Sequence, residues 1–271
     1  MSTGDKKVRL DALLVERGFA ESIANAGAII MSGSVFIDGA RARSAGQSIS
    51  PYASIEVRGK QDFVSRGGIK LKKALDFFSI SPAGKVCIDC GASTGGFTDC
   101  LLQAGAQMVY AVDVGYGQLA WSIRSDPRVV AMERTNIRFV KPEMFKFSPE
   151  LAAIDVSFIS LALVLPVVRQ ILPGNGEALC LVKPQFEAER GSVGSKGVVR
   201  DRAAHISVLE KFIADAAQSG YAVKGLTYSP VMGPEGNIEY LGWLKCSGES
   251  APVDISAVVS ESYASHMPHK E

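Results

Sequence analysis

VCIDCGASTGGF, residues 86–97, decides the fold, because it joins an apolar strand to a helix through a tight glycine-rich turn. Glycines in this turn let the backbone approach a ligand closely, and the free N–H groups at the start of the helix can bind it. The spacing does not fit the GxGxxG pattern of dinucleotide sites. The pattern DxGxxxGG, which begins at Asp89, instead favours S-adenosylmethionine, which has no pyrophosphate. A plain strand–turn–helix unit is the alternative.

Apolar strands that end in polar residues alternate with helical segments on both sides of this stretch. The expected strands are 86–89, 108–113, 129–132, 152–155 and 179–183, and the expected helices are 97–103, 118–124, 161–171 and 202–218. This alternation predicts a doubly wound, Rossmann-like α/β sheet with mostly parallel strands. Two late segments, 223–228 and 238–245, complete it with an antiparallel last strand. The second strand ends in Asp113, where a carboxylate can bind ribose hydroxyls.

The first 58 residues form a small α+β unit of their own. Leu10, Leu13 and Leu14 share one helical face, and Ser22 is placed to cap a second helix that ends at Gly33. Asp38-Gly39 is a typical hairpin turn. We therefore expect a small separate domain at 1–58, a linker at 59–63, the α/β domain at 64–246 and a tail at 247–271 with one helix.

Composition excludes several classes of protein. The chain has 271 residues, 47% of them apolar, and a net charge of +1, so it is neither disordered nor uniformly basic. Five cysteines are too few for a disulfide scaffold, and no segment is apolar enough to be a signal peptide or a membrane span. The expectation is a soluble, cytoplasmic protein. The Cys87–Cys90 pair is interpreted as strand packing, and no metal is expected.

Four charged residues stand at the ends of expected elements. Asp155 and Lys183 each end an apolar strand, while Glu239 opens the last strand and Lys70 lies near the start of a helix. Open α/β sheets bind ligands at the carboxyl edge of their strands, so these residues should gather around one crevice. A lysine held among such charges can serve as a general base. Taken singly, each residue also has a plain structural interpretation, such as a helix cap or a solvated lysine.

Five stretches of the chain match a known family. They are VSRGGIKL at 64–71, DCGASTGGFTD at 89–99, AVDVGYGQL at 111–119, KPQFE at 183–187 and GNIEY at 236–240. The chain resembles the TlyA proteins, often labelled haemolysin-like. These are FtsJ-type rRNA methyltransferases with an N-terminal RNA-binding domain like that of ribosomal protein S4. The resemblance covers almost the whole chain.

The resemblance implies methyl transfer from S-adenosylmethionine to the ribose 2′-oxygen of a cytidine in ribosomal RNA. The catalytic residues would be Lys70, Asp155, Lys183 and Glu239, with Lys183 deprotonating or orienting the hydroxyl, the carboxylates holding the lysines, and Lys70 positioning the ribose. The cofactor-binding residues would be Asp89, Gly91, Ala92, Ser93, Thr94, Gly95, Gly96, Asp113 and Asn136.

Ribosomal RNA or a ribosomal subunit is the expected partner, and a monomer is favoured. The expected RNA-binding residues are Lys6, Lys7, Arg9, Arg41, Arg43, Arg66, Arg134 and Arg138. The chain departs from the family at 22–27 (SIANAG), where basic residues usually stand in the second helix. Phe158, Phe186 and Tyr240 are either core residues or aromatic rings that stack on a target base.

Two other functions remain open. One is a membrane-active haemolysin, which would need an amphipathic or spanning segment. The other is a ribosome-associated RNA-binding protein with an inactive cofactor site.

Overall fold

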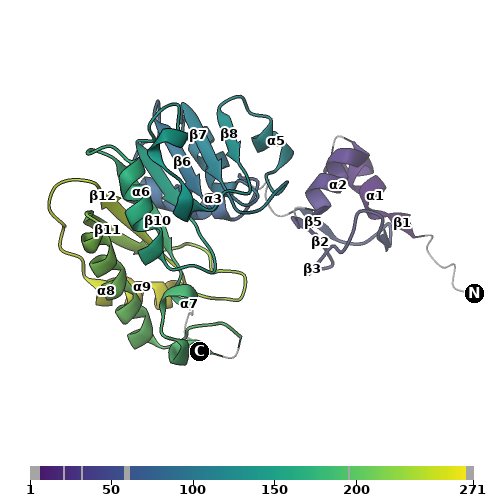
Figure 1. Ribbon diagram of the computed structural model, residues 1–271. Helices are drawn as coiled ribbons and strands as arrows, with labels where there is room; N and C mark the ends of the chain where they lie inside the picture. The colour runs from purple at the N-terminus through teal and green to yellow at the C-terminus, as the bar shows by residue number, and fades with distance from the viewer. Residues whose placement is uncertain (1–6, 21, 32, 58–61, 195, 267–271) are drawn as a thin grey trace, which may run out of the picture. The chain divides into compact units, whose positions relative to one another are not determined.

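A computed structural model describes residues 7–20, 22–31, 33–57, 62–194 and 196–266 (Figure 1). The chain forms two compact units, Met1–Asp62 and Phe63–Glu271. Lys6 and most of the expected linker lie outside the described residues.

The first unit packs two helices on short strands. Its elements are β1 (Val8–Arg9), α1 (Leu10–Glu16), α2 (Ile23–Met31), β2 (Val35–Ile37), β3 (Ala40–Arg41), β4 (Ser48–Ile49) and β5 (Ile55–Val57). The strands form a β3-β2-β5 sheet and a β1-β4 pair. Ser22 caps α2 as predicted, since its Oγ accepts the N–H of Asn25 at 3.1 Å. Asp38 and Gly39 both have positive φ, which confirms the hairpin turn.

The second unit is built on a seven-stranded sheet in the order β11-β12-β10-β9-β6-β7-β8. Its strands are β6 (Val86–Cys90), β7 (Met108–Val112), β8 (Val129–Met132), β9 (Leu151–Ile154), β10 (Glu177–Val182), β11 (Ala222–Tyr228) and β12 (Tyr240–Lys245). Neighbouring strands are parallel from β10 to β8, and β12 runs antiparallel to both β10 and β11. The predicted sheet is therefore confirmed, including its antiparallel last strand.

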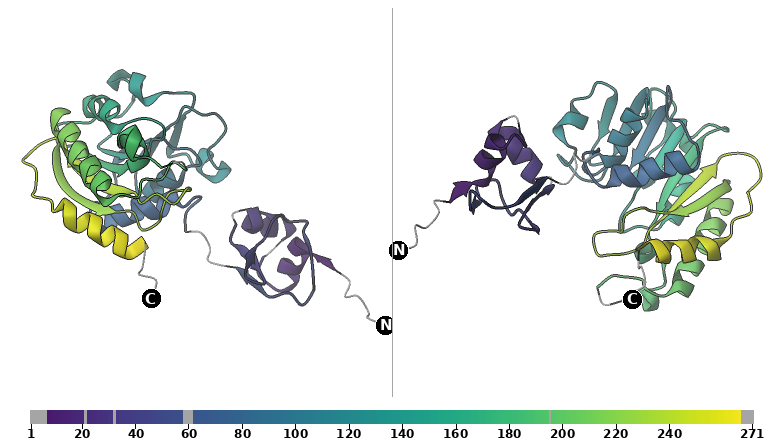
Figure 2. Two further views of the ribbon diagram at one scale, coloured as in Figure 1. Left: turned by 90° about the horizontal axis from the view of Figure 1, so that it is seen from below. Right: turned by 180° about the vertical axis from the view of Figure 1, so that it is seen from behind.

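Helices cover both faces of this sheet (Figures 1 and 2). They are α3 (Gly67–Phe77), α4 (Gly96–Gln103), α5 (Trp121–Arg124), α6 (Leu165–Ile171), α7 (Pro184–Glu187), α8 (Arg202–Gln218) and α9 (Ile255–His266), with the 3₁₀ turns η1 (Ile137–Phe139), η2 (Pro142–Met144), η3 (Leu161–Leu163) and η4 (Arg190–Ser192). One apolar core joins α3, α4 and α5 to the sheet, and a second joins α6, α8 and α9 to it. The helix expected in the tail, α9, thus packs in the core of this unit.

Two expected helices differ from the structure. The segment 161–171 is not one helix but η3 followed by α6, because Pro166 has no N–H to donate and is accommodated in the first turn of a helix. The segment 118–124 is helical only from Trp121, since Ala120 is extended and its N–H is bonded to the carbonyl of Thr94 at 3.1 Å.

All five cysteines are free thiols buried in the second unit. Burial raises the pKa of Cys87 and of Cys100 to about 12. Within the described ranges, no three His, Cys, Asp or Glu side chains are placed to bind a metal ion. Within the same ranges, no helix has both the length and the apolar character needed to cross a bilayer.

Candidate active site

The strand register brings the candidate residues to one edge of the sheet. Cys90 pairs with Val112 and with Ile154, so the residues that follow these strands leave the sheet at the same level. They are Gly91, Asp113 and Asp155. The antiparallel β12 starts at this edge, and its register pairs Val182 with Tyr240, which sets Lys183 beside Glu239. Because β12 is antiparallel, its N-terminal end lies at the edge where the parallel strands have their C-terminal ends.

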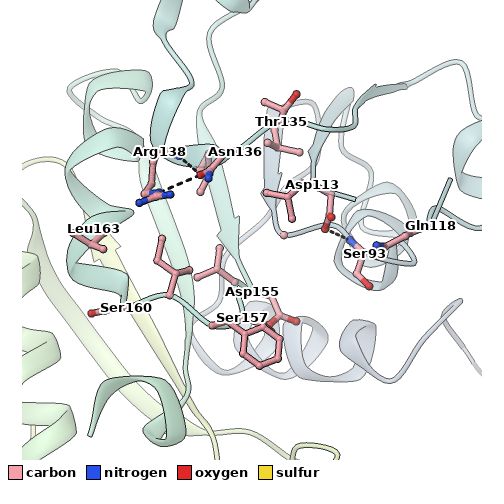
Figure 3. Close-up of a pocket in the computed structure, with 17 residues that line it drawn as sticks. Ser93, Asp113, Gln118, Thr135, Asn136, Arg138, Asp155, Ser157, Ser160 and Leu163 are labelled. Carbon is pink, nitrogen blue, oxygen red and sulfur yellow. Dashed lines mark hydrogen bonds between the residues drawn. The ribbon is translucent and has the colours of Figure 1, made fainter. Parts of the chain in front are cut away.

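A cavity of about 720 Å³ opens at this edge, between the loops that follow β6, β7, β8 and β9. Figure 3 shows Ser93 and Asp113 on one side of it and Asn136 with Arg138 on another. Asp113 accepts the N–H of Ser93 at 2.8 Å and that of Gly115 at 2.7 Å, so one carboxylate ties two of the loops together. The size is within the range of small-ligand sites.

A second cavity, of about 230 Å³, adjoins the first and shares Gly91, Ser93 and Asp155 with it. Lys70 and Arg66, both from the start of α3, line its other side. Asp155 is therefore the one candidate catalytic residue that faces both cavities, and Lys70 reaches the smaller one.

The glycine-rich turn leaves no room for a side chain at Gly91 or Gly96. Gly91 has φ +94°, and a Cβ there would lie 2.4 Å from the backbone oxygen of Asp155. A Cβ on Gly96 would lie 2.1 Å from Oγ of Ser65. Gly95, also at positive φ, caps α4. The turn thus packs directly on neighbouring backbone, and residues 91–94 and 96 line the smaller cavity. This close backbone cradle fits the cofactor site expected here.

The four candidate catalytic residues form two ion pairs. Nζ of Lys70 donates to Oε2 of Glu239 at 2.5 Å, and these residues are 8% and 1% exposed. Nζ of Lys183, 9% exposed, lies 2.6 Å from Oδ1 of Asp155. That contact lacks hydrogen-bond geometry; the hydrogen bond from Lys183 goes instead to Oγ of Ser157, at 2.9 Å. Lys70 is thereby oriented by a hydrogen bond to Glu239, and Lys183 by its hydrogen bond to Ser157 and its ion pair with Asp155.

Asp89 lies beneath the turn and lines neither cavity. It is fully buried, its Oδ2 accepts the hydroxyl of Thr98 at 2.6 Å, and its Oδ1 has no partner. Burial raises the pKa of Asp89 to about 7, against the hydrogen bond from Thr98, and the charges of Asp155 and Asp113 act in the same direction as burial. In the structure its contact is with α4.

Asn136, another of the expected cofactor-binding residues, lines the larger cavity. Its Oδ1 accepts the backbone N–H of Arg138 at 3.1 Å and Nε of the same residue at 3.4 Å. Arg138 is exposed at the rim. Arg134, also exposed, has φ +52° and stacks on the ring of Tyr116 at 4.3 Å. Two of the expected RNA-binding arginines thus stand beside the crevice.

The expected RNA-binding residues of the first unit differ in whether their side chains already contact other protein groups. Lys7 and Arg43 have exposed side chains. Arg9 is engaged with Asp11 at 2.6 Å, and its hydrogen bond holds the pKa of Asp11 below the usual range, against the effect of burial. Nε of Arg41 donates to the carbonyl of Gly33 at 3.0 Å.

Ser157 was not among the site residues expected from the sequence, and Phe158, Phe186 and Tyr240 were expected either in the core or stacked on a base. Ser157 contacts Lys183, and its place two residues after Asp155 was the available signal. Tyr240 is fully buried and its hydroxyl lies 2.8 Å from Nδ1 of His205, so its stacking on a base is excluded. Phe158 is 91% exposed, and its ring centroid lies 5.1 Å from that of Phe186.

Residues 63–246 match the family model of the FtsJ-like methyltransferases. The chain belongs to this family. Residues 8–51 of this FtsJ-like methyltransferase also match the S4 domain. Both matches agree with the resemblance inferred from the motifs, which is confirmed.

Similar proteins span most of this FtsJ-like methyltransferase. YqxC of Bacillus subtilis (strain 168), which is named as an rRNA methyltransferase, is 53% identical over 90% of this chain and 88% of its own. The 16S/23S rRNA (cytidine-2′-O)-methyltransferase TlyA of Mycobacterium tuberculosis (strain ATCC 25618 / H37Rv) is 44% identical over 91% and 92%. A solved structure from Streptococcus thermophilus, named as a hemolysin, has a TM-score of 0.75 at 43% identity and covers 97% of this chain and 98% of its own.

Proposed function

We propose that this FtsJ-like methyltransferase methylates the ribose 2′-hydroxyl of a cytidine in ribosomal RNA. S-adenosylmethionine is the methyl donor. The observation that carries the proposal is the pair of lysine–carboxylate contacts, Lys70–Glu239 and Lys183–Asp155, at the edge of two adjoining cavities. TlyA of Mycobacterium tuberculosis, to which the chain is 44% identical, is named for this reaction.

The cofactor, which supplies an activated methyl group on its sulfonium, would occupy the larger cavity beside the glycine-rich turn, whose Gly91 and Ser93 line both cavities. Within the glycine-rich turn, the N–H groups of Gly91, Ala92, Ser93 and Gly95 donate to protein oxygens, so Thr94 and Gly96 are the residues that would offer backbone N–H groups to the cofactor. Asp113 would contact its ribose, and Asn136 its adenine. Asp89 supports this turn from below through Thr98.

The two lysines act on the substrate hydroxyl. Lys183 orients the 2′-hydroxyl or deprotonates it. Asp155 and Glu239 hold the two lysines in place, and Lys70 positions the ribose from the smaller cavity or stabilises the developing alkoxide. Most of the gain in rate comes from placing the oxygen in the geometry for attack.

The RNA is held by the basic residues on both units. Arg66, Arg134 and Arg138 stand beside the crevice, and Lys6, Lys7, Arg9, Arg41 and Arg43 belong to the first unit. We place an RNA-binding domain at 1–58, a linker at 59–63 and the methyltransferase domain at 64–246, followed by the tail 247–271. A ribosomal substrate implies that the protein works in the cytoplasm, and we favour a monomer.

Methyl transfer from labelled S-adenosylmethionine to unmethylated small and large ribosomal subunits tests the proposal. The wild type should label a ribose, and Lys183→Ala should abolish labelling while cofactor affinity stays near that of the wild type. Lys85→Ala is the matched control, because Lys85 pairs with Glu177 at 3.1 Å near the opposite end of the strands. Normal turnover by Lys183→Ala would contradict the role of this lysine, and no labelling by the wild type would contradict the function.

A further inference from the structure

Two segments that are distant in sequence run together at the active edge. One is the loop 155–161, which leaves β9 and enters η3, and the other is 183–187, which leaves β10 and includes α7. The loop contributes Asp155 and forms one wall of the larger cavity through residues 155–160. Its position therefore decides both the shape of this wall and the placing of a candidate catalytic carboxylate.

At its first end, the loop is held by Lys183. The lysine contacts Asp155 at 2.6 Å and donates to Oγ of Ser157 at 2.9 Å. These contacts belong to the proposed catalytic residues. They leave the second half of the loop without support from that side chain.

At its second end, the loop is held by Glu187. Oε1 of this carboxylate accepts the backbone N–H of Leu161 at 2.7 Å, and Oε2 accepts the hydroxyl of Ser160 at 2.6 Å. Lys211, on α8, stands 3.5 Å from the same Oε2. The side chain of Glu187 is 5% exposed, so water does not replace these contacts. A buried carboxylate with two short hydrogen bonds is a strong anchor.

Between the two anchors the backbone is strained. Phe158 has φ +62°, a left-handed conformation that is unfavourable for a side chain of this size, and its ring is 91% exposed. A conformation of this kind persists only when the surrounding structure determines it. With Lys183 on one side and Glu187 on the other, the loop has a fixed end at each side of this residue.

We infer that Glu187 is a positioning residue for methyl transfer: its carboxylate fixes the loop 155–161, and through the loop it sets Asp155 and Ser157 around Lys183. The inference rests on the proposed function of this site. Glu187 lines neither of the two cavities at the active edge, and its carboxylate contacts Ser160, Leu161 and Lys211, so the loop is the path by which it reaches the catalytic residues.

The test compares Glu187→Ala with Glu187→Gln in the full chain. Alanine removes both contacts to the loop. Glutamine keeps them, because its amide oxygen can accept the N–H of Leu161 and its amide nitrogen can donate to Ser160. At saturating S-adenosylmethionine and ribosomal subunits, Glu187→Ala should lower kcat by about tenfold or more, since small misplacements at a reacting centre cost up to about 100-fold. Glu187→Gln should recover most of this loss.

Glu177→Ala is the matched control. Glu177 is also a largely buried carboxylate, 13% exposed, and it pairs with Lys85 at the start of β10 rather than after its end. Its loss should lower the melting temperature and leave kcat within twofold of the wild type. Hydrogen exchange over 155–164 should quicken in Glu187→Ala alone.

The outcomes that overturn the inference differ from the outcome that overturns the proposed function. Equal kcat in Glu187→Ala and the wild type, equal losses in the alanine and glutamine variants, or a loss of kcat that Glu177→Ala matches would each overturn the inference. Unchanged exchange over 155–164 in Glu187→Ala would also overturn it. A wild type that transfers no methyl group to any subunit would instead overturn the proposed function.

Discussion

Replacing Gly91 by alanine should separate the placement of the catalytic groups from the stability of the fold. A Cβ at this position would lie 2.4 Å from the backbone oxygen of Asp155, while ordinary contact begins at 3.4 Å. The turn and β9 must therefore move apart by about 1 Å. Because a misplacement of this size can cost about 100-fold in rate, we expect the rate of methyl transfer to fall by about 100-fold.

Gly84→Ala supplies the matched control at the other end of β6. Gly84 has φ +73°, close in type to the +94° of Gly91, but a Cβ there would meet nothing within 4 Å. Both variants bear the left-handed strain, about 1–2 kcal/mol, which lowers the melting temperature by about 2–8 °C in a domain of this size. Only Gly91→Ala adds the displacement.

The assay is single-turnover methyl transfer to ribosomal subunits, with the melting temperature measured on the same preparations. Gly84→Ala should keep its rate within about twofold of the wild type. If Gly91→Ala reacts as fast as Gly84→Ala, the packing of the turn on β9 does not place the catalytic groups, and the reasoning fails.

Three further outcomes are expected. Asp113→Asn leaves one loop N–H facing an amide N–H₂ group, which costs about 1.5–3 kcal/mol. Calorimetry should therefore show S-adenosylmethionine binding weakened by about 10- to 100-fold, and unchanged affinity would contradict the role of Asp113. Native Asp89 keeps its proton to about pH 7, whereas the unfolded chain loses it near pH 3.8, so the free energy of unfolding falls as the pH rises between these values. In urea unfolding at pH 5 and pH 8, Asp89→Asn should therefore gain stability relative to the wild type at the higher pH. A difference in stability that is the same at both pH values would refute this. Deleting residues 1–60 should weaken rRNA binding more than cofactor binding, and the reverse order would refute the assignment of RNA binding to the first unit.

The sheet was predictable from the sequence because its signals are local. Apolar runs that end in Asp89, Asp113 or Asp155 indicate parallel strands with polar residues at one edge, and the structure has this arrangement. The capping Ser22 and the Asp38-Gly39 turn are short-range signals of the same kind.

The details that organise the site come from contacts between distant residues. Glu187 meets Ser160 across 27 positions, and no periodicity links the two. Phe158 opens an apolar run, so its pattern indicates a core residue, yet it is among the most exposed side chains. The register that sets Lys183 beside Glu239 depends on β12 being inserted between β10 and β11, which no local pattern specifies.

The buried cysteines can report on unfolding of the second unit. All five lie between residues 87 and 246, and residues 1–62 contain none. A thiol reacts with a disulfide reagent only as an accessible thiolate, a state that burial suppresses here. The rate at which the unmodified chain is labelled therefore measures how often the methyltransferase unit unfolds, and the first unit contributes no labelling because it has no cysteine. Adding S-adenosylmethionine should slow this labelling by the factor 1 + [L]/Kd, where [L] is the free cofactor concentration, so the cofactor's affinity can be measured from the labelling rate without any RNA.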